Sequence, residues 1–201
     1  MCQSKQGLLR CNDCFSRRVL CHDCCLVVHQ ESPYHHIEKW TGSFFQATSL
    51  SEEGFTLHLC HNGVSCPVPQ PDTTTQGTKA ETQGTQQANN KKSLVVVDVS
   101  GVHQLQISWC RCKDTPAADI QLLRNDLFPA SISNPSTAFT FRLLNHFYID
   151  SVECKTSAMS FFSKLRRLTN DSDPDSVPVC LLVSHILTTS LIHIHRTDIG
   201  N

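Results

Sequence analysis

The sequence predicts an α+β protein that opens with a small metal-bound module, and three observations carry this prediction. Cysteine and histidine side chains are concentrated in residues 1–40. A β-branched run, Leu94–Val99, precedes an alternating segment that is typical of a β-hairpin. Two later segments space their apolar side chains as amphipathic helices do. We therefore expect a small N-terminal zinc-bound, cross-brace-like module, a β-hairpin region with a second zinc knuckle, and then two or three helices.

Composition divides the chain into parts with different expected roles. Residues 1–40 form the Cys/His module, and residues 41–67 with 93–116 form the hairpin region that carries the second zinc site. Residues 68–92 are rich in Thr, Gln and Asn with almost no apolar side chains, so we expect a disordered polar insertion that buries no core. Residues 117–170 are the predicted helical region. Residues 171–201 form a divergent tail, in which Cys180–His195 is strand-like but lacks an obvious partner.

The ordered elements after the insertion follow from local patterns. Apolar and polar residues alternate between His103 and Trp109 after Gly101, which indicates the second strand of a hairpin. Asp119–Leu127 is predicted to form a short helix that ends at Phe128-Pro129. Asn134–Thr137 offers the start of a second helix, and Thr156–Leu168 forms a third. The apolar face of the second helix would comprise Phe139, Leu143, Leu144 and Phe147.

The overall composition excludes several classes of protein. With 17 Lys and Arg against 18 Asp and Glu in 201 residues, the net charge of −1 argues against a globally basic nucleic-acid or membrane-surface protein. The longest apolar tract, Val179–His195, is shorter than the ~18 residues of a membrane span. Met1–Arg10 has no apolar leader region, so we expect a reducing compartment. There, clustered thiols in a chain with 12 Cys and 11 His are interpreted as metal ligands rather than as disulfides.

The first group of metal ligands follows a regular spacing. Two C-x2-C pairs precede two histidines, and such a pair on a tight turn can place both thiolates on one tetrahedral Zn²⁺. An interleaved arrangement joins the first pair to the histidines in a Cys2His2 site and leaves the second pair for another ion. The expected ligands of the first site are Cys11, Cys14, His29 and His35. Because this segment has few apolar residues, metal binding would supply its folding energy.

The second N-terminal site is incomplete in the sequence. Cys21 and Cys24 form the second pair, and Cys2 is the natural third ligand. A fourth ligand is missing. Cys25, His22 and His36 are substitutes at less natural spacing.

A second group of ligands lies on either side of the polar insertion. His61 and Cys66 belong to a knuckle-like segment, and Cys110 and Cys112 form a C-x-C pair at the end of the predicted hairpin. These four residues would make a closed Cys3His structural site. The insertion between the halves is tolerable because loop closure costs little more as a loop lengthens. Cys60 and His103 are competing ligands, while other histidines and Cys154 lack ligand spacing.

These motifs, taken in order, resemble a known family. They resemble the cysteine-cluster region that precedes the fungal KDZ (Kyakuja–Dileera–Zisupton) transposases, over roughly Cys11–Asn170. The residues that carry the resemblance are Cys11-x2-Cys14-Phe15, Cys21-x2-Cys24-Cys25, Pro33-Tyr34-His35, Ile37–Trp40, His61-x-Gly63-x2-Cys66-Pro67, Gly101-Val102-His103, Trp109–Cys112, Gln121–Arg124, Leu127–Ala130 and Thr137–Phe141. The resemblance implies a CxC2-like zinc-chelating domain that is associated with a transposase.

The resemblance also implies a location and a length. A transposase-associated protein is expected to act in the nucleus. The catalytic region of the family should lie beyond Asn170, where the resemblance ends, so we expect the chain to be the front end of a larger protein. On this hypothesis the tail at 171–201 is out-of-frame or unspliced sequence.

No catalytic constellation is visible in the sequence. Asp98 ends an apolar strand before Gly101, as in RNase H-like folds, but a turn-favouring carboxylate explains it more simply. Cys60-His61 lacks an orienting acid or an oxyanion element. We therefore expect a non-catalytic zinc-binding fragment with two to three ions, no small-molecule substrate and no membrane association. DNA is one expected partner, through the phosphate-binding candidates Arg10, Arg17, Arg18, Lys164, Arg166 and Arg167.

Two alternatives remain open at this point. The segment Cys11–His35 is also similar to B-box-type zinc modules, which mediate contacts between proteins. The chain is alternatively a non-functional remnant of a mobile element. Salt-dependent DNA binding would separate the first of these from a DNA-binding function.

Overall fold

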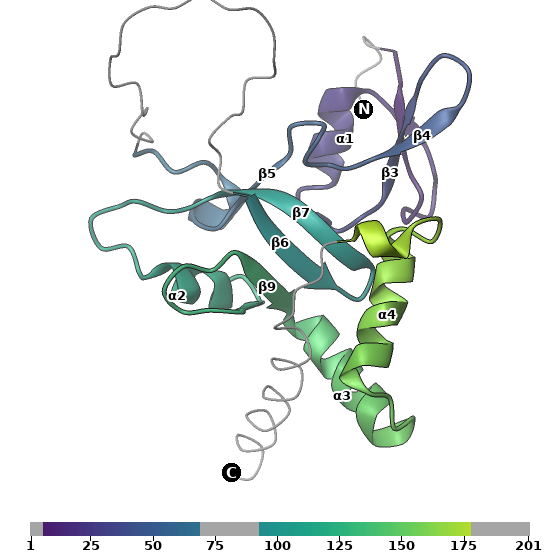
Figure 1. Ribbon diagram of the computed structural model, residues 1–201. Helices are drawn as coiled ribbons and strands as arrows, with labels where there is room; N and C mark the ends of the chain where they lie inside the picture. The colour runs from purple at the N-terminus through teal and green to yellow at the C-terminus, as the bar shows by residue number, and fades with distance from the viewer. Residues whose placement is uncertain (1–5, 69–92, 178–201) are drawn as a thin grey trace, which may run out of the picture.

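The computed structural model of the chain describes residues 6–68 and 93–177. Two β-sheets and four α-helices are arranged in two connected parts, which confirms the predicted α+β class (Figure 1). Cys2, the strand-like segment at 180–195 and all of the predicted insertion except Val68 lie outside the described residues. No described helix has both the length and the apolar character needed to cross a bilayer.

The N-terminal part is a small antiparallel sheet with one short helix beside it. Its strands are β1 (Leu9–Cys11), β2 (Val19–Leu20), β3 (Ile37–Trp40) and β4 (Phe45–Thr48), in the order β2-β1-β3-β4. Helix α1 (His22–Val28) packs against this sheet over a small core that includes Leu9, Ile37 and Phe55. These strands are two to four residues long, which is too short for a period-2 pattern to reveal them in the sequence.

The larger sheet has five strands, β5 (Thr56–His58), β6 (Ser93–Asp98), β7 (Gly101–Ser108), β8 (Leu127–Pro129) and β9 (Thr137–Thr140). Their order is β5-β7-β6-β9-β8. Strands β6 and β7 pair antiparallel from Leu94↔Leu105 to Asp98↔Gly101, so the predicted hairpin is confirmed. Strand β5 pairs in parallel with β7, and β9 pairs in parallel with β6. Strand β5 follows β4 in the chain and is the edge strand of the larger sheet, so the chain passes directly from the N-terminal sheet into the larger one.

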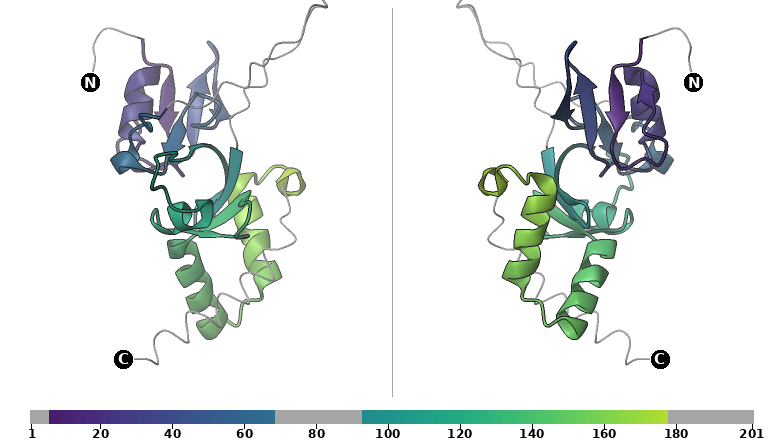
Figure 2. Two further views of the ribbon diagram at one scale, coloured as in Figure 1. Left: turned by 90° about the vertical axis from the view of Figure 1, so that its left-hand side faces the viewer. Right: turned by 90° about the vertical axis from the view of Figure 1, so that its right-hand side faces the viewer.

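Helices cover both faces of this sheet. Helices α3 (Phe141–Glu153) and α4 (Ala158–Thr169) pack on one face through a core that includes Val97, Phe139 and Phe161 (Figure 2). Helix α2 (Ala118–Leu123) covers the other face, where Leu122 is fully buried. Two 3₁₀ turns, η1 (His61–Gly63) and η2 (Pro174–Ser176), complete the described elements. The predicted helix at 156–168 is therefore confirmed as α4, with Ser157 as its N-cap.

Two predicted helix boundaries are wrong. The helix expected to reach Leu127 ends at Leu123, because Asp126 takes a left-handed conformation and Leu127 enters strand β8 opposite Thr140. The helix expected to begin at Asn134–Thr137 begins instead at Phe141, and Thr140 caps it by accepting from the Leu143 N–H at 3.1 Å. Pairing with β6 makes 137–140 a strand, a long-range contact that overrides the local pattern.

The turn between β6 and β7 holds the two parts of the molecule together. Ser100 Oγ lies 3.1 Å from the carbonyl oxygen of Tyr34, and Tyr34 belongs to the N-terminal part. Gly101 adopts φ +141°, where a Cβ atom would lie 2.7 Å from the Thr169 hydroxyl. That hydroxyl receives the Val102 N–H at 2.7 Å, so the end of α4 closes onto the same turn.

Candidate metal centres

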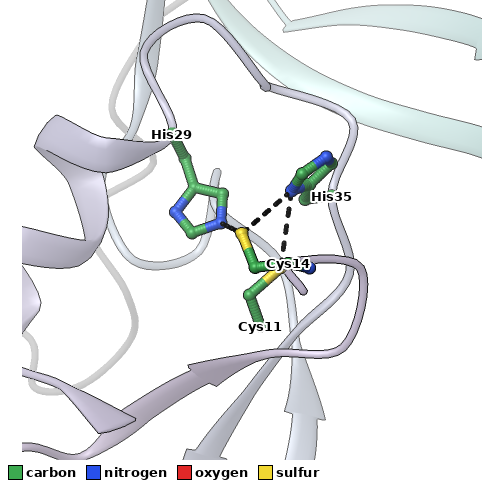
Figure 3. Close-up of side chains that lie close together, drawn as sticks. All are labelled: Cys11, Cys14, His29 and His35. Carbon is green, nitrogen blue, oxygen red and sulfur yellow. Dashed lines mark hydrogen bonds between the residues drawn. The ribbon is translucent and has the colours of Figure 1, made fainter. Parts of the chain in front are cut away.

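The first cluster brings together Cys11, Cys14, His29 and His35, whose ligand atoms all lie within 4.8 Å of one another. Figure 3 shows the four side chains converging from the end of strand β1, the turn after it, the end of helix α1 and the loop before β3. A tetrahedral zinc ion at ~2.3 Å from sulfur and ~2.0 Å from nitrogen requires S···N separations of about 3.5–3.6 Å. The observed separations are 3.5 Å from Cys11 to His35, 3.6 Å from Cys14 to His29 and 3.5 Å from Cys14 to His35. The donors therefore fit a tetrahedral ion.

Surrounding groups orient these ligands. The Cys14 N–H donates to Cys11 Sγ at 3.3 Å, which tightens the turn that carries the C-x2-C pair. His29 is fully buried, and its Nδ1 lies 2.8 Å from the Cys25 carbonyl. That bond places the ring proton on Nδ1 and leaves Nε2 free to face Cys14 and the cluster. Bonds to Cys11 and Cys25 raise the pKa of His29 to about 11, so a metal ion must displace a proton here.

The second cluster contains five ligand-type side chains. Cys60, His61, Cys66 and Cys110 have their ligand atoms within 4.8 Å of one another. Cys112 joins them, with its Sγ 3.8 Å from Cys66 Sγ and 3.5 Å from His61 Nε2. A tetrahedral zinc site has S···S separations of about 3.8 Å. Cys110 Sγ lies 3.7 Å from His61 Nε2, so these three separations among the expected ligands match a tetrahedron. Cys60 is a fifth candidate.

The loop that carries Cys110 and Cys112 is held by Gln121, a residue that was not among the predicted site residues. Gln121 is 5% exposed on α2; its Oε1 receives the Cys110 N–H at 2.8 Å, and its Nε2 donates to the Pro116 carbonyl at 3.0 Å. A polar residue on the buried face of a predicted helix is the only sequence feature that marks it. The Thr115 hydroxyl, followed by the Cys112 N–H, lowers the pKa of the Cys110 thiol to about 6.

Two other thiols of this cluster, Cys60 and Cys112, hold their protons more tightly, whereas the backbone N–H of Arg111 lowers the pKa of Cys66. Burial and then the Cys110 thiol raise the pKa of Cys60 to about 12, and the Cys110 and Cys66 thiols raise that of Cys112 to about 11. Because a metal ion binds thiolates, loading this cluster must release protons.

The second N-terminal site stays a prediction. Within residues 6–68 and 93–177, Cys21 and Cys24 belong to neither of the two clusters, and Cys2 is outside that range. Of the three substitutes, His22 contacts the Glu53 carbonyl at 2.7 Å and His36 contacts Asp13 at 2.9 Å. Cys25 lies 3.7 Å from His29 Nδ1. All three therefore face groups other than the Cys21/Cys24 pair.

Other candidates also lie away from the clusters. His103, considered as a competing ligand, places its Nε2 2.9 Å from Ser100 Oγ, and burial lowers its pKa to about 4. Cys154 is exposed at the C-cap of α3. None of the ten cysteines in the described part of the chain forms a disulfide.

Most of the expected phosphate-binding cations are already engaged with carboxylates. Arg10 lies 2.6 Å from Glu38, and Lys164 lies 2.9 Å from Asp150. On α4, two arginines pair with the following loop, Arg166 with Asp175 and Arg167 with Asp171. Arg17 and Arg18 lie in the exposed loop after Cys14, where Arg18 contacts the Ser16 hydroxyl at 2.9 Å.

Asp98 is a buried ion-pair centre as well as a turn residue. Its side chain is 0% exposed and accepts from the Ser100 N–H, the Thr140 hydroxyl at 2.7 Å and the Arg142 guanidinium at 2.7 Å. Burial acts to raise its pKa, but the Arg142, Thr140 and Ser100 bonds outweigh it and lower the pKa. Both carboxylate oxygens are thus occupied by donors of the same chain.

Comparison with known proteins identifies the family. The family model described as "CxC2 like cysteine cluster associated with KDZ transposases" matches residues 50–173, which include the whole second cluster, the β6–β7 hairpin and helices α2 to α4. The first cluster precedes the matched region. No curated protein matches the chain. No solved structure matches it either. The match spans more than half of the chain, and the chain therefore belongs to the CxC2-like cysteine-cluster family that is associated with KDZ transposases.

Proposed function

We propose that this chain is a zinc-binding, non-catalytic module that contributes to DNA recognition by a transposase-associated protein in the nucleus. The observation that carries the proposal is the tetrahedral spacing of two Cys/His clusters in a chain of this family. Thiolate with imidazole ligands is the donor set that structural zinc sites use. The identity of the metal as zinc rests on this chemistry.

The clusters are proposed to be structural because four protein ligands leave no open coordination position for a substrate. The first cluster lies in a part of the chain whose core is small, so the ion would supply much of its folding energy. Asp98, the one carboxylate that suggested an RNase H-like site, is occupied by Arg142 and Thr140. We therefore expect it to hold the fold rather than a catalytic metal ion.

The test is metal content combined with ligand substitution. We expect the purified full chain to carry at least two zinc ions per molecule by mass spectrometry of the metal. Cys11→Ser should remove one ion and unfold the N-terminal part, while the exposed Cys154→Ser should leave metal content unchanged. A metal content near zero, or an equal loss from both variants, contradicts the proposal.

A protein-binding function is the second candidate, and a specific observation favours it. Apolar side chains around the first cluster are unusually exposed, with Phe15 fully exposed and Val27 64% exposed. Exposed apolar surface of this kind is typical of protein contacts, as in B-box-type modules. Binding of the chain to duplex DNA at low salt separates the candidates, because a pure protein-binding module would not bind it.

A further inference from the structure

Three basic side chains lie at the rim of the second cluster. Arg111 and Lys113 flank the ligand Cys112, and Arg124 follows helix α2. All three are exposed. Lys113 and Arg124 line one open cavity of about 520 Å³, together with the ligands Cys60 and Cys110. The fold therefore gathers cations from two separate segments beside the proposed metal ion.

None of these three cations has a carboxylate partner among the described residues, unlike most of the phosphate-binding candidates that the sequence offered. Arg10, Lys39, Arg142, Lys164, Arg166 and Arg167 each form an ion pair. No ion pair involves Arg111, Lys113 or Arg124 within residues 6–68 and 93–177. The guanidinium and ammonium groups at the rim thus keep their hydrogen-bonding capacity for an external anion.

The local charge remains positive when the metal centre is included. A zinc ion with three thiolates and one neutral imidazole carries a net charge of −1. Asp114 is the one carboxylate that lines the same cavity in the described structure, and it adds a further −1. Lys113 and Arg124 balance this total, and Arg111 beside Cys112 adds one further positive charge, whereas the ion pairs of α4 are neutral.

We propose that the rim of the second cluster, defined by Arg111, Lys113 and Arg124, is the surface that contacts the phosphate backbone of duplex DNA. The inference rests on the proposed function and replaces the earlier phosphate-binding candidates that are paired with carboxylates, which are Arg10, Lys164, Arg166 and Arg167. The cations project from exposed positions rather than converging on an enclosed pocket, which suits a repeating polyanion better than a single phosphate ion. Backbone contacts of this type supply affinity and salt dependence without sequence preference.

The test compares two triple variants that remove the same charge. The rim variant carries Arg111→Gln, Lys113→Gln and Arg124→Gln. The control variant carries Arg10→Gln, Lys164→Gln and Arg167→Gln, whose cations are paired with carboxylates. Binding of the zinc-loaded full chain to a mixed-sequence 20-base-pair duplex is followed by fluorescence anisotropy from 50 to 200 mM salt. Each lost phosphate contact should make the log–log salt slope about 0.9 less steep, or about 2.7 for all three.

The outcomes separate the inference from the proposed function. We expect the rim variant to keep its zinc and lose most of the salt slope, while the control variant loses little. An unchanged slope in a zinc-loaded rim variant, or an equal loss in the control, overturns the inference alone. Loss of zinc from the rim variant also overturns the inference, because the three cations would then stabilise the thiolate ligands rather than bind DNA. Competition by 10 mM inorganic phosphate at constant ionic strength would show a single-phosphate site instead. Failure of the wild-type chain to bind zinc contradicts the proposed function itself.

Discussion

Replacing Asp98 with Asn tests whether one buried carboxylate acts as an ion-pair centre that joins the β6–β7 turn to strand β9 and helix α3. Asp98 is 0% exposed and accepts from the Ser100 N–H at 3.1 Å, the Ser100 hydroxyl at 2.8 Å, and both Thr140 and Arg142 at 2.7 Å. Its lowered pKa keeps it charged at neutral pH, despite a burial that acts the other way. An Asn amide would present N–H groups to donors and remove the charge that faces Arg142.

The expected loss of unfolding free energy is large for a single isosteric substitution. Removing one partner of a buried ion pair typically costs about 3–5 kcal/mol of unfolding free energy. The Arg142 side chain is 66% exposed and remains hydrated when its partner is lost, which favours the lower end of that range. Asp150→Asn is the matched control, because Asp150 pairs with Lys164 on the surface and should cost no more than about 1 kcal/mol.

The assay is urea unfolding at pH 7.5, with free zinc held constant and metal content measured for each variant. Asp98→Asn should lower the unfolding midpoint several times more than Asp150→Asn while both variants retain their metal. Combining Asp98→Asn with Arg142→Gln should cost less than the sum of the single changes, since the two groups act as a pair. Equal effects of the two Asn variants, or strict additivity with Arg142→Gln, would refute the assignment of Asp98 as an ion-pair centre.

Three further changes probe other parts of the structure. Gly101→Ala should lower the unfolding free energy by about 1–3 kcal/mol, because φ +141° is strained for Ala and the new Cβ would lie 2.7 Å from the Thr169 hydroxyl. Thermal unfolding measures this loss. An unchanged unfolding midpoint would contradict the turn geometry. Thr140→Val should cost at least about 1–2 kcal/mol, because it removes both the cap of Leu143 and the hydrogen bond to Asp98. Thr140→Ser should retain most of the stability in the same assay. Zinc affinity of the metal-free chain should rise with pH between 6 and 8, because thiols such as Cys112, with a pKa of about 11, hold protons that zinc must displace. Calorimetry in buffers of different ionisation enthalpy should show proton release, and pH-independent binding would exclude thiolate ligation.

The hairpin and the last helix could be predicted because their patterns are local. Strands β6 and β7 are long enough for β-branched and period-2 patterns to appear, and α4 shows an apolar stripe with Ser157 in place as its cap. Residues 137–140 could not be predicted in the same way. Phe139 was correctly placed in the core with Leu143 and Phe147, but its strand conformation depends on pairing with β6, some forty residues earlier.

The metal sites likewise combine ligands that the sequence predicted with supporting contacts that only the fold creates. Spacing alone grouped Cys11 and Cys14 with His29 and His35, because C-x2-C turns and interleaved pairs constrain where an ion can sit. Cys60 was named from the sequence as a competing ligand of the second cluster, whereas the burial of Gln121 behind this cluster depends on how α2 packs against the sheet. The paired state of Arg10 and Lys164 was equally invisible, since Glu38 and Asp150 reach them only in the folded chain.

The sequence by itself determined the family, the α+β class and the metal-ligand pairs, because each of these is written in residue types at short and regular spacing. Only the tertiary structure decided which strands pair across the insertion, which groups donate hydrogen bonds to the Asp98 carboxylate, and which cations remain without carboxylate partners among the described residues. The physical reason is that ligand spacing and hydrophobic period act over a few residues, whereas strand pairing and charge neutralisation join groups that are distant in the chain.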